Sequence, residues 1–511
     1  MAAGIFLSRI FGLVRNSVLS HYFGTSAVAD AYNVALRIPN VLQNLFGEGA
    51  LSASFIPVYA RLRARGEEEA AGRVAGAVFA LLALVTAILV LAGVLATPWL
   101  VEVLAPGFDD GRRALTVRLV RIFFPGIGIL VLSAWCLGIL NSHRRFLLSY
   151  SAPVLWNVAI IATLLWYGGR LGATELAVAA AWGSVAGALL QFLVQLPTVL
   201  RLERQLRVDG GGVGPHVRTV VRNFGPAVLS RGVVQISAWI DTIIATLLGT
   251  GAAAALGYAQ QLYVLPVSLF GMSVSAAELP AMSSATGSDD EIAATLRTRL
   301  TAAMRRVAFF VVPSAAAFLF LGDAVAAAVL QSGRFTAADS RYVWAILAGA
   351  AIGLLATTLA RLYSSAFYAL RDTRTPMRIA TLRIGVGIVA GYLAAVHLPP
   401  LLGIAPRWGA AFLTASSGIV GWGELLLLRH SLGRRVGPTG IPAPFVLRLW
   451  GAALLAGATG LALKLALPLG RPSAMLVLVT FGVTYLGATR LLRIPEGDAL
   501  TSTLHRLTRR R

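Results

Sequence analysis

Charged and amide side chains recur at helical spacing in two apolar segments near the start of this 511-residue chain. In the segment 27–58 they share one face of a predicted helix: Asp30, Asn33, Arg37, Asn40, Asn44 and Glu48. The segment 3–23 carries a second polar stripe, with Arg9 beside it: Ser8, Gly12, Arg15, Asn16 and Ser20. Guanidinium groups donate two parallel hydrogen bonds and stay protonated, so they suit phosphate. The two stripes therefore predict a shared polar cavity for an anionic group, with Asp30 and Glu48 holding the arginines in its absence.

The alternative interpretation is that these residues form structural ion pairs. If the apolar segments lie in a membrane, an ionisable group within them costs roughly 3 kcal/mol or more, and pairing lowers that cost. Arg9 lies nearest to the start of its helix and has the further option of extending to the membrane surface. The second half adds more ionisable candidates: Arg231, Asp241, Glu278, Arg361 and Arg383. Asp241 lies in the apolar stretch SAWIDTIIAT, which predicts a cationic partner or a protonated carboxyl group. Glu278 and Arg361 fit a structural or interfacial place.

The composition predicts the elements that position these residues. Hydrophobic residues make up 57% of the chain and charged residues 13%, and the mean hydropathy is +0.75, whereas a soluble domain carries about 25% charge. Apolar runs of roughly twenty residues can each cross a hydrocarbon core of about 30 Å. We therefore predict an all-α polytopic membrane protein of about 14 transmembrane helices, near 3–23, 27–58, 72–98, 114–140, 149–168, 173–199, 219–248, 252–283, 303–322, 342–368, 376–397, 408–428, 447–468 and 473–491.

The net charge of +22 follows this predicted topology and gives no reason to expect nucleic-acid binding. All the basic residues except Lys464 are arginines, and most loop arginines fall on one set of alternate loops. The other set holds only Arg112, Arg113, Arg170, Arg334, Arg341, Arg407 and Arg471. Positively charged loops stay in the cytoplasm, so both termini are expected there. The basic side would also attract anionic membrane lipids.

Metal and nucleotide sites are not expected. Cys136 is the single cysteine, and the six histidines have no paired ligand spacing. The glycine-rich stretch at 209–214 lacks the following Lys-Ser/Thr of a phosphate-binding loop. We therefore predict no cofactor, no metal and no ATPase activity.

An internal repeat divides the chain. LFGEGALSASFIP (Leu45 to Pro57) resembles LFGMSVSAAELP (Leu269 to Pro280), and a Gly-Thr pair precedes each copy, at Gly24 and at Gly249. Each copy contains six predicted helices, an even number, so the halves are parallel repeats with a substrate path expected between them. We predict an N-terminal lobe at 1–199, a cytoplasmic linker at 200–218, a C-terminal lobe at 219–430, and a terminal helix pair with a basic tail at 431–511.

Several motifs together resemble the MurJ (MviN) family of lipid II flippases, in the multidrug/oligosaccharidyl-lipid/polysaccharide exporter superfamily. They are SRIFGLVR (Ser8 to Arg15), ADAYNVALRIPNVLQNLFGEGALSASFIPVY (Ala29 to Tyr59), LAPGF (Leu104 to Phe108), GRFTAAD (Gly333 to Asp339) and FYALRDTRTP (Phe367 to Pro376). The resemblance implies two six-helix lobes and a terminal helix pair that forms a groove for a lipid tail. It implies transport of lipid II, the undecaprenyl-diphosphate-linked peptidoglycan precursor, from the cytoplasmic to the periplasmic leaflet of the inner membrane by alternating access.

The resemblance associates Arg9, Arg15, Asp30 and Glu48 with the central cavity. The chain departs from the family at Gln43 and Gln261, where members often place a basic residue, and Arg37 is the candidate substitute. Some members bind sodium through an acid in helix 7 and ligands in helix 11. Asp241 fits the acid, but Gly387 and Gly391 stand at the expected ligand positions, which leaves sodium coupling doubtful. We hypothesise that Arg383 pairs with Asp241 as a built-in cation; extension of Arg383 to the headgroups is the alternative.

Other functions remain as alternatives. One is export of another polyprenyl-linked glycan or of a small molecule, although a cationic compound would favour an acidic cavity. A membrane glycosyltransferase would need a loop carboxylate or metal site, and the loop acids at 67–69, 109–110 and 289–291 have no ligand-like spacing. A structural scaffold would need no charged cavity. The resemblance favours a transporter over an enzyme, with lipid II and membrane lipids as partners and cell-wall synthesis proteins as candidate partners.

Overall fold

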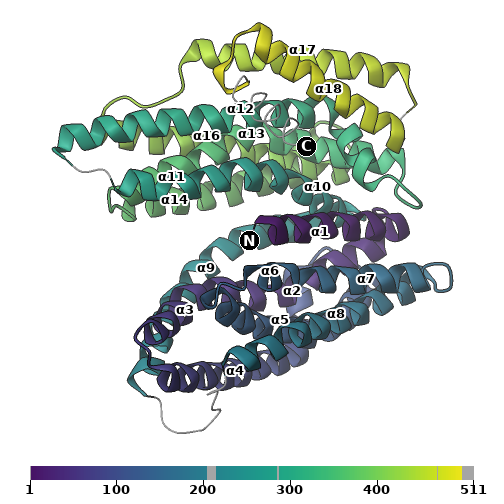
Figure 1. Ribbon diagram of the computed structural model, residues 1–511. Helices are drawn as coiled ribbons and strands as arrows, with labels where there is room; N and C mark the ends of the chain where they lie inside the picture. The colour runs from purple at the N-terminus through teal and green to yellow at the C-terminus, as the bar shows by residue number, and fades with distance from the viewer. Residues whose placement is uncertain (1, 204–213, 285–286, 469, 498–511) are drawn as a thin grey trace, which may run out of the picture. The chain divides into compact units, whose positions relative to one another are not determined.

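The computed structural model of the chain describes residues 2–203, 214–284, 287–468 and 470–497 (Figure 1). These residues form helices and no strands, as expected for an all-α protein. The chain divides into two compact units, Met1–Ala254 and Ala255–Arg511. The boundary falls in the first turn of α10 (Ala252–Pro266).

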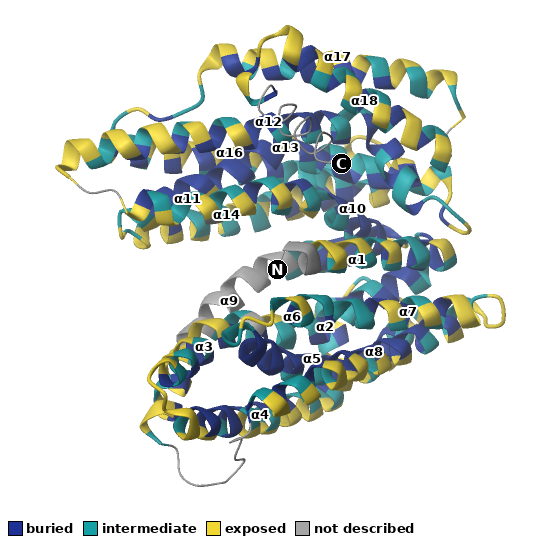
Figure 2. Cartoon of the chain, viewed as in Figure 1, coloured by how far each residue is buried: buried dark blue, intermediate teal, exposed yellow. Residues whose placement is uncertain are grey.

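The first unit is built from nine helices among its described residues. They are α1 (Ala2–Phe23), α2 (Ala27–Phe46), α3 (Glu48–Ala64), α4 (Glu68–Leu104), α5 (Asp110–Ser142), α6 (Phe146–Ser151), α7 (Pro153–Tyr167), α8 (Ala173–Leu202) and α9 (Pro215–Leu247). α5 is the most buried of the long helices, and it packs against α2, α4 and α8 (Figure 2). Its Trp135 lies in the core and donates a hydrogen bond to the carbonyl of Ala75 in α4.

The second unit continues α10 and adds the remaining described elements. They are the π-helical turn η1 (Val267–Met272), α11 (Ser273–Ser283), α12 (Asp289–Leu330), α13 (Ala337–Ala369), α14 (Arg374–Tyr392), the π-helical turn η2 (Leu393–His397), α15 (Leu398–Leu401), the 3-10 turn η3 (Pro406–Trp408), α16 (Gly409–Val436), α17 (Ala443–Ala466) and α18 (Arg471–Leu491). α13 packs against both α12 and α16, and α17 and α18 pack on α12. α12 and α13 form the buried centre of this unit (Figure 2).

The chain is a polytopic membrane protein. Eleven helical segments of the described residues are long and apolar enough to cross a membrane. The expected number of about fourteen also counts α1, α2 with α3, and α9, which carry most of the charged residues discussed above and are not among these eleven. Along α4, the residues Leu84, Ile88, Leu91 and Leu95 share one face and are each more than half exposed. Such an apolar face is suited to contact lipid.

The two sequence repeats coincide with matching interruptions of long helices. The first copy spans the break between α2 and α3 at Gly47, and the second spans the π-helical turn η1 between α10 and α11. Phe108 follows α4 and Phe335 follows α12, and both side chains are buried. The order of long helices in the first half thus recurs in the second, as the repeat predicts.

The compact units divide one helix later than the predicted lobes. α9 belongs to the first unit, where it packs against α2, α3 and α4. Of the predicted linker, residues 204–213 lie outside the described residues. The lobe boundaries therefore remain a prediction from the sequence repeat.

Candidate functional site

The candidate site lies at a break in the second predicted membrane segment. The sequence predicts one helix over 27–58, whereas α2 continues through Pro39 and ends at Phe46, and the helix is interrupted at Gly47. A Cβ atom on Gly47 would lie only 2.2 Å from the carbonyl oxygen of Gln43, so glycine is required in this conformation. The break separates α2 from α3, and residues on both sides of it line a cavity.

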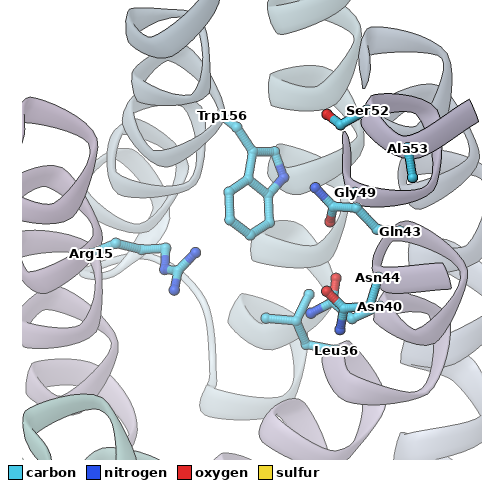
Figure 3. Close-up of a pocket in the computed structure, with 9 residues that line it drawn as sticks. All are labelled: Arg15, Leu36, Asn40, Gln43, Asn44, Gly49, Ser52, Ala53 and Trp156. Carbon is cyan, nitrogen blue, oxygen red and sulfur yellow. The ribbon is translucent and has the colours of Figure 1, made fainter. Parts of the chain in front are cut away.

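The cavity has a volume of about 800 Å³ and lies within the first unit. Its lining residues are Arg15, Leu36, Asn40, Gln43, Asn44, Gly49, Ser52, Ala53 and Trp156. Figure 3 shows the Arg15 guanidinium pointing toward the middle, with the amides of α2 on the opposite side. We call it the Arg15 cavity.

Neighbouring side chains orient Arg15. Its Nε and Nη2 atoms donate hydrogen bonds to Oδ1 of Asn16 at 3.3 and 3.2 Å. Its guanidinium carbon lies 4.8 Å from the centre of the Trp156 ring, which is a cation–π distance. The lining residues that the structure describes include no carboxylate. A cation held by an amide and an aromatic ring, beside further amide donors, can bind an anionic or hydroxyl-rich group.

Asp30 has a different environment from Arg15. Its carboxylate accepts hydrogen bonds from the backbone N–H groups of Gly251, at 2.6 Å, and Ala254, at 2.8 Å. It thereby caps the first turn of α10, where the helix dipole favours a negative charge. Asp30 is fully buried, and its Oδ2 atom lies 3.7 Å from Nη1 of Arg112. The charged neighbour expected for Asp30 is therefore Arg112.

The loop between α4 and α5 brings Arg112 to this point. Arg112 also donates to Oδ2 of Asp109 at 2.6 Å, and the side chain of Asp109 caps α5. Gly107, from the LAPGF motif, packs so closely on the end of α9 that a Cβ atom would lie 2.1 Å from the carbonyl oxygen of Thr246. This motif therefore has a local structural role in placing Arg112 beside Asp30.

The predicted polar stripe of α2 divides between two surroundings. Asn40, Asn44 and the neighbouring Gln43 line the Arg15 cavity. Arg37 instead donates a hydrogen bond to Oγ1 of Thr242 in α9 and interacts electrostatically with Asp241. The long arginine side chain reaches the adjacent helix, which a projection of one helix does not show.

The remaining predicted residues lie apart from this cavity or outside the described part. Arg9 is exposed on α1, and Gln261 is half-buried in α10. The side chains of Glu48 and Arg231 lie outside the described residues. Glu278 is near two arginines of α12, at 3.9 Å from Arg299 and 3.4 Å from Arg306. The predicted binding roles of Arg9, Glu48 and Gln261 therefore stay predictions, and the surroundings of Glu278 are those of a structural ion pair.

Arg383 has a carboxylate partner that we did not predict. Its Nε atom lies 3.2 Å from Oε2 of Glu424 in α16. Asp241 belongs to the first unit and Arg383 to the second, so a pair between them stays a hypothesis. Glu424 lies in the apolar stretch GWGELLLL, and an acid in such a stretch was the available signal.

Two further charged residues were missed for different reasons. Arg112 counted as a loop residue, because only the fold shows that its loop lies over Asp30. Asp323 lies one residue beyond the predicted span 303–322, and its Oδ2 atom is 2.6 Å from Nζ of Lys464 in α17. Asp323 and Lys464, the only lysine of the chain, each lie in or next to an apolar stretch, and this could have indicated the pair.

Comparisons with known proteins agree on one family. A family model described as Lipid II flippase MurJ matches residues 19–482. A Burkholderia cenocepacia protein named Lipid II flippase MurJ is 34% identical over 464 residues, covering 88% of this chain and 86% of that protein. A Rhizobium meliloti protein named probable lipid II flippase MurJ is 32% identical and covers 86% of this chain and 81% of its own length.

Solved structures show the same fold. A structure titled lipid II flippase MurJ, inward closed conformation, has a TM-score of 0.77 at 22% identity and covers 96% of this chain and 98% of that chain. An inward-facing multidrug resistance transporter of the MATE family has a TM-score of 0.68 at 17% identity, covering 84% of this chain and 95% of its own.

Proposed function

Because this chain belongs to the lipid II flippase MurJ family, we propose that it moves lipid II from the cytoplasmic to the periplasmic leaflet by alternating access. The protein is then a transporter, and its task is to carry a charged, hydroxyl-rich headgroup across an apolar core. A headgroup crossing that core needs polar partners at membrane depth, since unpaired polar groups there are costly.

The Arg15 cavity is the observation that carries this proposal. Its volume of about 800 Å³ is within the range of sites that enclose small molecules, about 300–1,000 Å³. Arg15 supplies a permanent positive charge for the diphosphate, and the amides of Asn40, Gln43 and Asn44 offer hydrogen bonds to sugar or peptide groups.

The other predicted substrate-binding residues differ in their surroundings. Gln43 lines the cavity at a position where family members often have a basic residue. Arg15 is therefore the cation that remains in the described part of the lining. Arg37 is directed to Thr242 and supports the diphosphate only if it leaves that partner. Arg9, Glu48 and Gln261 remain substrate-binding candidates on the sequence resemblance.

The setting completes the proposal. We place the protein in the bacterial inner membrane with both termini in the cytoplasm, because the termini fall in the same predicted set as the arginine-rich loops and positively charged loops stay in the cytoplasm. Cell-wall synthesis proteins are proposed partners, and the proposal includes no cofactor. Sodium coupling is not part of the proposal, because Gly387 and Gly391 offer no side-chain ligand.

Complementation tests the role of Arg15. In cells depleted of the protein, Arg15→Ala is expected to reach normal membrane levels and fail to restore growth, while Arg15→Lys restores it partly. The matched control is Arg118→Ala, because Arg118 is exposed on α5 in the same unit. Full growth with Arg15→Ala would refute the diphosphate role.

A further inference from the structure

A second polar pocket lies inside the other unit. It has a volume of about 480 Å³ and is lined by residues of α10, η1, α11, α13, α14 and α16. Its polar lining includes Tyr263, Ser275, Thr357, Arg361, Arg383 and Glu424. These elements cross an apolar layer, so a pocket with three ionisable side chains needs a physical reason.

The charges in this pocket do not balance. Glu424 accepts from Arg383, with Nε and Oε2 3.2 Å apart. Arg361 lines the same pocket, and no described carboxylate lies within ion-pair distance of it. The described lining therefore carries two guanidinium groups for one carboxylate, which leaves one positive charge in excess.

Hydroxyl groups surround these charges. The hydroxyl of Tyr263 and Oγ1 of Thr357 are hydrogen-bonded at 3.0 Å, which joins α10 to α13. Oγ of Ser275 is buried and has no hydrogen-bond partner among the described residues. A buried hydroxyl without a partner loses the hydrogen bonds that it made in water, and a ligand oxygen in the pocket would restore one.

Both arginines lie well inside their helices, away from the nearer helix ends. Arg361 is eight residues from the end of α13 at Ala369, and Arg383 is nine residues from the start of α14 at Arg374. At 1.5 Å per residue, each lies about 12 to 14 Å along its helix from that end. A phosphate that reaches them therefore enters the pocket between these helices.

We propose that this pocket binds the phosphate or diphosphate group of a lipid. Arg361 makes the first contact, because Glu424 is ion-paired with Arg383 and interacts with Arg361 only at longer range. Arg383 exchanges Glu424 for the incoming oxyanion, since guanidinium binds both in the same planar geometry. The phosphate site stands on this pocket alone, whereas lipid II as the source of the phosphate rests on the proposed function.

Binding of inorganic diphosphate to the purified full-length protein tests the site. The titration uses neutral detergent, constant ionic strength and an Arg15→Gln background, so that the Arg15 cavity contributes little. Arg361→Gln should weaken binding at least tenfold, because a charge-assisted contact is lost. Arg378→Gln is the matched control, because Arg378 is exposed on α14 and does not line the pocket.

Glu424 separates a binding site from a structural ion pair. Glu424→Gln should strengthen diphosphate binding several-fold, because it frees Arg383, while Arg383→Gln should weaken it. A purely structural pair predicts that both changes destabilise the fold and neither raises affinity. Equal binding by the Arg361→Gln and Arg378→Gln proteins, or no gain from Glu424→Gln, would overturn the proposal.

Nanodiscs of phosphatidylcholine identify the source of the phosphate. Lipid II or phosphatidylglycerol is added to each, and the rise in melting temperature is compared between the Arg361 and Arg361→Gln proteins. Loss of the rise with lipid II alone assigns the site to the substrate path, and loss with phosphatidylglycerol alone assigns it to a membrane phospholipid. No loss with either lipid contradicts a lipid phosphate site, even if lipid II transport itself is intact.

Discussion

The guanidinium of Arg112 lies 3.7 Å from the carboxylate of Asp30. The same carboxylate caps the first turn of α10. Asp30 thus has two backbone N–H donors and one cation in a fully buried position. A buried carboxylate keeps its charge only when it has such partners. This arrangement makes Asp30 a structural joint between α2, the α4–α5 loop and the start of α10.

Replacing Asp30 should therefore destabilise the protein. For Asp30→Ala we expect a loss of about 3 kcal/mol, because Arg112 and two N–H groups lose their buried partner. Asp109→Ala removes the other partner of Arg112, and its effect should be smaller because Asp109 is exposed. Thermal unfolding of both variants in detergent gives the comparison. Equal losses would contradict the central place of Asp30.

Lys464 and Asp323 hold the terminal helix pair to α12. Nζ of Lys464 lies 2.6 Å from Oδ2 of Asp323 and 4.8 Å from the centre of the Trp344 ring. Lys464→Met should cost about 3 to 5 kcal/mol, because it leaves a buried carboxylate unpaired. The double variant Lys464→Met with Asp323→Asn should be more stable than Lys464→Met alone. Additive losses in a double-mutant cycle would show that the two side chains are not coupled.

A hydrogen-bonded chain joins α3, α5 and α8 at one end of the first unit. The hydroxyl of Tyr59 donates to Glu203 and lies 3.0 Å from Nε2 of His143. Partial burial lowers the pKa of His143, and the nearby Arg63 and Arg145 lower it further, while Glu68 opposes them. Burial raises the pKa of Glu203. As the pH falls, His143 therefore lowers the stability of the folded state and Glu203 raises it.

The contribution of His143 to stability depends on pH, because its pKa is lowered in the folded protein. The folded state prefers neutral His143, so its contribution is fully present above the unfolded pKa of about 6.5 and is lost as the pH falls through the folded value. Glu203 opposes this trend at acidic pH, so the comparison uses His143→Gln as the control. The stability advantage of the unaltered protein over His143→Gln should shrink between pH 8 and pH 5.5. A difference in melting temperature between the two proteins that stays the same at all pH values would exclude this role.

The predicted topology can be tested with single cysteines. A cysteine at Glu67, in the exposed turn between α3 and α4, should resist a membrane-impermeant thiol reagent in intact cells. A cysteine at Gly169, in the exposed turn between α7 and α8 with open space around it, should react. Cys136 is buried and should give little background. The reverse labelling pattern would invert the membrane orientation.

The sequence was sufficient for the helices and the repeat, because apolar length and spacing are local properties. The second segment was predicted as one helix over 27–58, and α2 does continue through Pro39, because a proline is tolerated within a membrane helix when neighbouring elements compensate. The break at Gly47 depends on a close approach to the Gln43 carbonyl, which only the fold shows.

The site was less predictable than the fold. Polar spacing on α2 identified Asn40, Asn44 and Arg37, but the length of the Arg37 side chain takes its guanidinium to α9. Arg112 and Trp156 are distant in sequence from the residues they contact, so helix periodicity carried no signal for either. Glu424 was visible as an acid in an apolar stretch, and its partner Arg383 required the packing of α14 against α16.

The leaflet distribution of lipid II tests the central claim most directly. Cells depleted of the protein are exposed to an external enzyme that cleaves only lipid II on the periplasmic face, and the cleaved fraction is measured. The account predicts that depletion makes lipid II resistant to cleavage, that the unaltered protein restores cleavage, and that Arg15→Ala does not despite normal membrane levels. Unchanged cleavage after depletion, with no other transporter present, would contradict lipid II translocation by this protein.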